Sequence, residues 1–379
     1  MAHALPALSA AWTPAVLPFL VAMGVCLVLV PVTMAMAPRL GAIADASRAR
    51  DVHESPTPRL GGLAMMAGFG VAVLIFGSSV EHRLTVVAIC AAISIAMVVD
   101  DALHLPPSTK LLLELSAGVA VAAAGITIDF ISTPGGHVLH FGLLAAPITI
   151  AWVAGMQTSI NLIDGVDGVA AGVCAIVAGV LLLAAVNRVS PQDPVQSGVI
   201  VMAGALMGAC IGFLVWNFHP ARSFMGDSGS HFLGVALAIM SVSGIAKVAL
   251  ALSMAIPILA MGLPIGDTAW AIWRRKRKGM KVTEGDAGHI HHRLLDRGLS
   301  VRETAVTFWL ATAILGCFAL ALFGHQHILI VAVVLLTLSL AALLWRNRRR
   351  LPPAEEPDYM VLPGRAAVPS RARHGRELD

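Results

Sequence analysis

The chain has 379 residues, of which 57% are hydrophobic and 13% are charged, and its mean hydropathy is +0.81. An average soluble domain is less apolar and carries about 25% charged residues, so this composition excludes an ordinary water-soluble fold. The formal net charge of +4 is modest, and we expect no nucleic-acid partner.

Long apolar runs recur along the chain, at lengths near the roughly 20 residues that a helix needs to cross a bilayer. This pattern predicts an all-α polytopic membrane protein with about eleven transmembrane helices in a single domain over residues 1–345. Segment 129–143 contains Pro-Gly-Gly and predicts a small external hairpin. The predicted spans lie near residues 15–37, 61–79, 84–99, 111–127, 144–160, 169–187, 197–216, 229–243, 246–270, 303–323 and 326–345.

The basic residues indicate the orientation, because they gather in alternate loops and such loops face the cytoplasm. The N-terminus is then outside and the C-terminus cytoplasmic. Residues 346–379 are rich in Pro, Arg and Glu without apolar periodicity, so we expect a disordered basic cytoplasmic tail. The predicted cytoplasmic loops are 38–60, 100–110, 161–168, 217–228 and 271–302.

The third predicted span ends in two adjacent acids, Asp100 and Asp101. Carboxylates at the C-terminal end of a helix oppose its macrodipole, so helix energetics give no reason for them. A solvated helix end is the simpler alternative, but the pair favours a functional interpretation.

The sequence NLIDGVDGVAAG (residues 161–172) spaces Asn161, Asp164 and Asp167 three residues apart. In a helix this spacing places the three side chains near one face. In a loop the intervening glycines let the backbone wrap a ligand. An Asx-rich turn between two spans is the alternative.

In NFHPARSFMGDSGSHFLG (residues 217–234), Asp227 stands at the start of a predicted span. The free N–H groups and positive dipole end there suit an anion, and a carboxylate can hold Mg²⁺ against phosphate oxygens. A helix N-cap is the alternative for Asp227. Phe224 can stack on a base, with ordinary packing as its alternative.

The basic loop contains GDAGHIHHRLLDRG (residues 285–298), with His289, His291, His292 and Arg293. No H-E-x-x-H spacing or cysteine partner supports zinc binding. With the arginine beside them, these histidines are interpreted as phosphate or sugar contacts.

All four segments fall on the predicted cytoplasmic side. Carboxylates at membrane depth are costly and mark functional sites by default. Beside a phosphate site, paired carboxylates also require a cation to neutralise the combined charge.

Together with DVHESPTPRLGG (residues 51–62), these motifs resemble the polyprenyl-phosphate N-acetylhexosamine-1-phosphate transferase family of glycosyltransferase family 4. The resemblance runs from Val16 to about Trp345, and the motifs occur in family order. Each motif alone is weak, whereas five in order are specific. The phospho-MurNAc-pentapeptide translocase of peptidoglycan synthesis is a relative of this family.

The resemblance implies transfer of a sugar-1-phosphate from a UDP-sugar to undecaprenyl phosphate, with release of UMP and with Mg²⁺ or Mn²⁺ as cofactor. The active site would face the cytoplasm at a bacterial inner membrane and start cell-envelope polysaccharide synthesis, such as O-antigen or teichoic acid. The His-x-His-His form favours UDP-GlcNAc as the donor. A homodimer is left open.

Matched position by position, the family's site residues fall on the motifs above. The implied catalytic residues are Asp100, Asp101, Asp164 and Asp227. The implied metal ligands are Asp227, Asn161 and Asp164. The implied substrate contacts are Arg59, Asn161, Asp167, Asn217, Phe224, His289, His291, His292 and Arg293.

Two positions depart from the family pattern. His104 stands near a third acid of the acidic motif and receives no catalytic role, and Ala46-Ser47 follows Asp45 where the family has Asp-x-Pro. The alternatives are the peptidoglycan translocase, a cation-coupled transporter with acids at mid-bilayer depth, and an inactive scaffold.

Overall fold

The computed structural model describes residues 4–44, 56–132, 138–186, 194–243 and 298–322, with isolated positions between 262 and 345. Two short antiparallel hairpins pair β1 (Ile43–Ala44) with β2 (Thr57–Pro58) and β3 (Phe130–Ser132) with β4 (Val138–His140). A 3₁₀ turn, η1, covers Gly142–Leu144. The helices are α1 (Ala4–Leu40), α2 (Gly61–Phe76), α3 (Arg83–Leu103), α4 (Pro107–Ala123), α5 (Ala145–Ile163), α6 (Val169–Val186), α7 (Pro194–Asn217), α8 (Gly226–Ser243) and α12 (Val301–Leu322).

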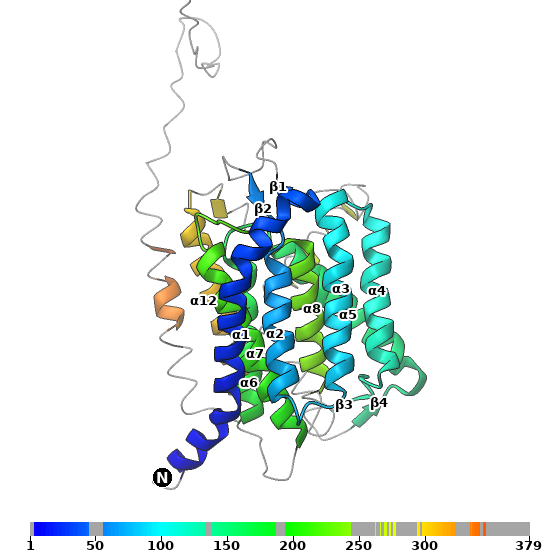
Figure 1. The fold of residues 1–379 in the computed structure, drawn as a ribbon. Helices are drawn as coiled ribbons and strands as arrows, with labels where there is room; N and C mark the ends of the chain where they lie inside the picture. Colours follow the sequence, from blue (N-terminus) through cyan, green and yellow to red (C-terminus); the bar gives the residue numbers. More distant parts are fainter. Residues whose placement is uncertain are drawn as a thin grey trace, which may run out of the picture.

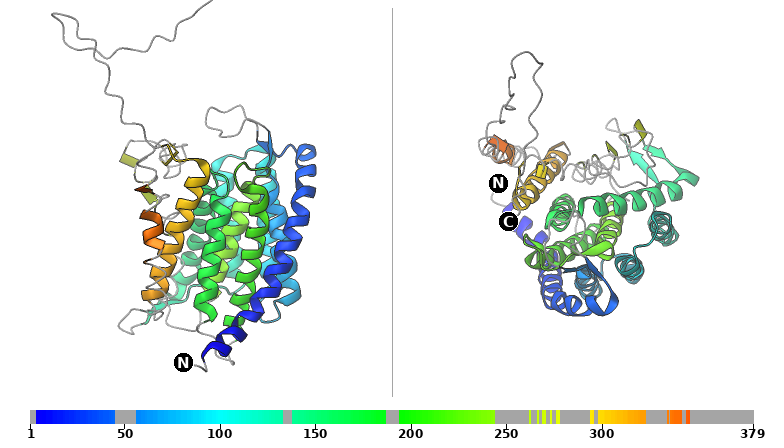
Figure 2. Two further views of the ribbon diagram at one scale, coloured as in Figure 1. Left: turned by 90° about the vertical axis from the view of Figure 1, so that its left-hand side faces the viewer. Right: turned by 90° about the horizontal axis from the view of Figure 1, so that it is seen from above.

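The helices lie side by side and run up and down along a common direction (Figures 1 and 2). The β1–β2 hairpin lies at one end of this bundle and the β3–β4 hairpin at the other (Figure 1). Because α1 through α8 alternate in direction, the C-terminal ends of α3, α5 and α7 meet the N-terminal ends of α4, α6 and α8. This shared end is the one that carries β1 and β2.

Helices α6 and α8 form the centre of the bundle, since most residues of each are buried. Helices α1, α3 and α4 instead expose leucine and valine side chains, among them Leu17, Leu84 and Leu112. Backbone polar groups inside helices are satisfied within each helix, so an apolar helical exterior of this kind suits hydrocarbon. The arrangement is that of a multi-pass membrane protein.

Six described helices are long and apolar enough to cross a membrane: Thr13–Leu40, Arg83–Leu103, Gly142–Ile163, Val169–Val186, Gln196–Asn217 and Val301–Ala321. The shorter α2 is also apolar. Helices stand at nine of the predicted spans in this part of the chain, whereas spans 246–270 and 326–345 and the tail 346–379 lie largely outside it. The total of eleven, the orientation and the division at residue 345 stay predictions.

The hairpin predicted within 129–143 is confirmed in the structure. Strands β3 and β4 pair antiparallel, with Phe130 opposite His140 and Ser132 opposite Val138. The hairpin lies at the end of the bundle opposite β1 and β2 (Figure 1). Polar groups gathered at the other end are therefore separated from it by the length of the helices.

A close approach of α2 to α8 requires glycine. A Cβ atom on Gly62 would overlap the backbone N and Cα of Gly229 and would come 2.7 Å from the Met225 carbonyl oxygen. Backbone atoms inside two packed helices have little freedom to move aside. The contact thus brings the start of α2 directly against the first turn of α8.

Replacing Gly62 with alanine is expected to destabilise the fold by about 1–3 kcal/mol, because the added methyl group overpacks this helix contact. Thermal unfolding in detergent measures the effect. Gly24→Ala in α1 is the matched control, since a Cβ there meets nothing within 4 Å. Equal unfolding temperatures for the two variants would contradict the close approach.

Candidate active site

Asp227 lies in the first turn of α8, at the end of the bundle that carries β1 and β2. The segment before it is held by backbone hydrogen bonds: the Phe224 N–H donates to the Pro58 carbonyl at 2.8 Å, and the Gly61 N–H donates to the Phe224 carbonyl at 3.0 Å. Gly226 then turns the chain into the helix with φ +68°, a conformation that glycine adopts without strain. The backbone around Asp227 is therefore fixed from two sides.

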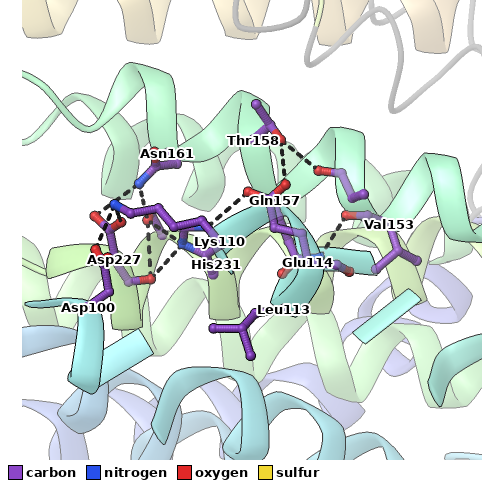
Figure 3. Close-up of polar contacts among 12 residues, drawn as sticks. Asp100, Lys110, Leu113, Glu114, Val153, Gln157, Thr158, Asn161, Asp227 and His231 are labelled. Atoms are coloured by element: carbon purple, nitrogen blue, oxygen red, sulfur yellow. Dashed lines mark hydrogen bonds and ion pairs between the residues drawn. The ribbon is translucent and has the colours of Figure 1, made fainter. Parts of the chain in front are cut away.

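Lys110, near the start of α4, bridges two acids. Its Nζ lies 2.7 Å from Asp100 Oδ2 and 2.6 Å from Asp227 Oδ2, as Figure 3 shows. The three groups come from α3, α4 and α8, and the ammonium offsets the repulsion between the two carboxylates, which lie close enough to interact directly. Asp100 also accepts a hydrogen bond from the Leu105 N–H at 2.8 Å.

Asp101 faces the N-terminus of α8. Its two carboxylate oxygens accept hydrogen bonds from the backbone N–H groups of Asp227 (2.7 Å) and Ser228 (3.1 Å), and the residue is only 1% exposed. A carboxylate at this position satisfies free N–H groups and the positive end of the helix dipole. Asp101 therefore stabilises the N-terminal end of α8. Its expected role in the reaction stays a prediction.

Asn161, in the last turn of α5, points at the same carboxylate as Lys110 (Figure 3). Its amide Nδ2 donates to Asp227 Oδ1 at 3.2 Å and to Ser230 Oγ at 3.1 Å. Asp227 consequently receives a neutral donor on one oxygen and a charged donor on the other.

Asp164 follows directly after α5 and caps it. Desolvation by burial raises the pKa of the Asp164 carboxyl well above its usual range, and the negative charge of Asp227 raises it further. A positive charge close to this carboxyl would favour its ionised form. The positive charge of Arg59 acts in this direction and lowers the pKa of Asp164.

Asp167 and Asn217 tie the two loops of the site together. Asp167 Oδ2 lies 2.8 Å from His219 Nδ1 and accepts a hydrogen bond from the Ala221 N–H at 3.0 Å. Asn217 accepts from the Gly168 N–H at 2.9 Å and donates to the Ser223 carbonyl at 2.9 Å. Both side chains are buried. The contacts named here are to the protein itself, and the expected contacts of these two residues with substrate remain predictions.

Helix α12 fastens the same two loops from outside. The Trp309 indole N–H donates to the Gly168 carbonyl at 3.0 Å, and Arg302 Nε donates to the His219 carbonyl at 2.9 Å. The ring of Trp309 also packs on Phe218, with centroids 5.6 Å apart. The loop that contains the histidine motif precedes α12, so this helix links that loop in sequence to the site.

Arg59 lies at the rim, where its Nη1 is 3.5 Å from His104 Nε2. Phe224 is partly buried beside the loop and contributes the backbone bonds described above. Four further predicted contacts, His289, His291, His292 and Arg293, and also Asp45, lie outside the described residues.

The oxygen donors present fit Mg²⁺ in part. Mg²⁺ is usually held by one or two carboxylates together with substrate phosphates, rather than by a cage of protein ligands. The ammonium of Lys110 between Asp100 and Asp227 shows that a positive charge is accommodated between two acids here. Within the described ranges no three His, Cys, Asp or Glu side chains are grouped to hold a metal alone. Asn161 turns its amide nitrogen, not its oxygen, toward Asp227.

Several residues of this site were not predicted from the sequence. Lys110 is a lone lysine at the start of an apolar helix, and its position ten residues after Asp100 is the one available signal. Arg302 and Trp309 follow the histidine motif (residues 285–298) but belong to none of the motifs. They become visible only once α12 is packed against the loops.

The sequence profile of Glycosyl transferase family 4 matches residues 83–245, a range that includes Asp100, Lys110 and Asp227. A probable undecaprenyl-phosphate N-acetylglucosaminyl 1-phosphate transferase of Bacillus subtilis (strain 168) is 35% identical over 311 residues, 81% of this chain and 84% of the relative.

Two other relatives carry related names. A decaprenyl-phosphate N-acetylglucosaminephosphotransferase of Mycobacterium tuberculosis (strain ATCC 25618 / H37Rv) is 33% identical over 305 residues, 74% of this chain and 75% of that protein. A phospho-N-acetylmuramoyl-pentapeptide-transferase of Desulforudis audaxviator (strain MP104C) is 29% identical over 339 residues, 80% and 98% of the two chains.

Asp101→Ala is expected to lower the free energy of unfolding by about 3 kcal/mol, because it leaves two N–H groups at the start of α8 without their charged acceptor. Thermal unfolding of the detergent-solubilised protein measures this loss. Asp129→Ala is the control, since that acid accepts a hydrogen bond from Thr127 at an exposed position. If both variants unfold at the temperature of the parent protein, Asp101 does not hold α8.

Proposed function

The chain belongs to glycosyl transferase family 4, and from this membership we propose that it transfers N-acetylglucosamine-1-phosphate from UDP-GlcNAc to undecaprenyl phosphate, releasing UMP. The observation that carries the proposal is the Asp100–Lys110–Asp227 group, which lies where the end of α3 meets the starts of α4 and α8. Opposite charges are held there in a preformed arrangement.

The reaction joins two negatively charged phosphates. An oxygen of the lipid phosphate attacks the β-phosphorus of the UDP-sugar and forms the new P–O bond of a diphosphate. The bond between that phosphorus and the bridging oxygen breaks, and UMP leaves with its α-phosphate. Such a transfer needs alignment and charge neutralisation more than covalent help from the protein.

The residues of the chain supply several of these needs. The ammonium group of Lys110 can exchange its hydrogen bonds to the two carboxylates for one to a phosphate oxygen, since an ammonium is a strong hydrogen-bond donor to phosphate. Arg59, at the rim, is a second cation for a phosphate. Asp100 lies beside Lys110 and is the acid that we assign to the lipid phosphate. Asp101 holds the first turn of α8, which carries Asp227.

Asp227 and Asp164, with Asn161 beside them, are the residues that we propose to hold Mg²⁺ or Mn²⁺. The ion would supply positive charge to the phosphates of the donor. To coordinate the ion through its amide oxygen, Asn161 would have to rotate its side-chain amide and give up its present hydrogen bonds to Asp227 and Ser230.

The names of the relatives support the sugar. Two of those described above are named for N-acetylglucosamine phosphate transfer to a polyprenyl phosphate. The relative named for phospho-N-acetylmuramoyl-pentapeptide transfer supports that activity as the second candidate. The transporter alternative has no counterpart among these names.

We propose that the protein lies in the bacterial cytoplasmic membrane with the acidic end toward the cytoplasm. The distribution of basic residues among the loops supports this orientation, and a nucleotide-sugar donor would then reach the site from the side where nucleotides are made. The product would be the first lipid-linked intermediate of an envelope polysaccharide.

The proposed function is tested by measuring UMP release with undecaprenyl phosphate, Mg²⁺ and a panel of UDP-sugars. UDP-GlcNAc is expected to be used, and Asp227→Asn, which removes one charge, is expected to abolish release while the protein still inserts and folds. Release with UDP-MurNAc-pentapeptide alone would favour the second candidate. Full activity of Asp227→Asn at limiting Mg²⁺ would remove Asp227 from the mechanism.

Lys110→Met is expected to lower kcat at least tenfold, a magnitude typical of losing one preorganised charge from a phosphoryl-transfer site. Lys110→Arg keeps the charge and is the matched control, expected to retain more activity than the methionine variant. Initial rates across UDP-GlcNAc concentrations separate kcat from KM. Equal rates for the methionine variant and the parent would show that the bridge between Asp100 and Asp227 is not used.

A further inference from the structure

A second charged pair lies one helical turn deeper than the site. His231 Nε2 is 3.1 Å from Glu114 Oε1, and the two residues are 0% and 6% exposed. Neither belongs to the residues predicted from the sequence, and the transfer chemistry above does not use them. Figure 3 shows the pair beside the Lys110–Asp227 contact.

The two pairs form a ladder between α4 and α8. Lys110 and Glu114 are four residues apart on α4, and Asp227 and His231 are four residues apart on α8, so each helix presents both residues on one face. The order of charge is basic then acidic on α4, and acidic then basic on α8. A shift of either helix by one turn would place Glu114 opposite Asp227, where like charges repel.

Helix α5 completes both rungs of this ladder. Asn161 donates to Asp227 at the upper rung, and Thr158 Oγ1 lies 2.9 Å from Glu114 Oε2 at the lower rung. Gln157 Nε2 donates to the backbone carbonyl of Glu114 at 3.1 Å. The lower rung is therefore enclosed by three helices.

The ring of His231 connects the lower rung to the backbone of Asp227. Its Nδ1 lies 2.8 Å from the Asp227 carbonyl oxygen. That oxygen can only accept, so Nδ1 donates to it, and a hydrogen bond from Nε2 to the Glu114 carboxylate requires the second ring hydrogen of an imidazolium. With both nitrogens engaged, the imidazole joins the first turn of α8 to α4.

A buried ion pair of this kind gives little net stability, because removing two charges from water costs as much as their attraction returns. Its attested value is in specifying one arrangement out of several. Here the arrangement that it specifies is the register of α4 against α8, and with it the placement of Lys110 and Asp227.

We propose that Glu114 and His231 are positioning residues for the transfer reaction: they set Asp227 and Lys110 opposite each other and touch neither substrate. The inference rests on the proposed function, since it concerns the same site. A displacement of catalytic groups by about 1 Å can cost a hundredfold in rate.

The test compares kcat and KM for UDP-GlcNAc in His231→Gln, Glu114→Gln and the double variant, each expressed per folded enzyme. Each single variant is expected to lower kcat about tenfold or more with KM changed less than twofold. The double variant is expected to resemble the worse single variant, because both changes disable one unit. Thr158→Val, which removes only one contact to Glu114, is expected to give a smaller loss in kcat.

Ser241→Ala is the matched control. It removes a hydrogen bond from the Trp152 indole N–H, 2.9 Å long, which also joins α5 to α8 but lies far along the helix from Asp227. Its kcat is expected to equal that of the parent, and combining it with Glu114→Gln is expected to leave the kcat of Glu114→Gln unchanged.

Three results would overturn the inference: parental kcat in both single variants, multiplicative losses in the double variant, or an equal loss in Ser241→Ala. If the single variants fail to fold, Thr158→Val with parental kcat overturns it as well. Absence of UMP release by the parent protein with every UDP-sugar would instead reject the proposed function.

Discussion

The acidic end of this bundle depends on the contact of the Lys110 ammonium with the carboxylates of Asp100 and Asp227. Carboxylates placed near apolar helices are costly unless a partner compensates them. Asp100 and Asp227 come from helices more than one hundred residues apart in sequence, and the ammonium between them turns their mutual repulsion into attachment. The same charge is of the kind that a phosphate-transfer site must offer its substrates, so the contact that stabilises the fold also prepares the chemistry.

Around this contact, other polar side chains hydrogen-bond to the backbone and hold it in place. Asp101 satisfies the start of α8, Asp167 and Asn217 join the two loops, and α12 fastens those loops from outside. Each of these contacts fixes backbone rather than reaching outward. Rigid backbone under a small number of charged groups is the condition for electrostatic preorganisation.

Much of this could be predicted from the sequence, because apolar runs define helices and their alternation brings every second helix end together. The helices near Asp100, Asn161 and Asp227 follow from that rule, and the hairpin near Phe130 follows from the Pro-Gly-Gly turn in segment 129–143. Side-chain partners do not follow from it. The sequence shows that Asp101 is an acid, but not that it faces backbone N–H groups. Nor does the sequence show that Lys110 and His231 have partners on other helices. The histidine motif lies outside the described residues.

The central claim, that the acidic groups share one face of the membrane, is tested most directly by labelling single cysteines with a membrane-impermeant maleimide in a background without native cysteines. Ser108, Gly165 and Arg222 are exposed at the acidic end, and Leu143, 97% exposed, lies beside the opposite hairpin. Cysteines at the first three positions should react in inside-out vesicles and be protected in right-side-out vesicles, with the reverse for position 143. Reaction of any of the three from the same side as position 143 would contradict the account.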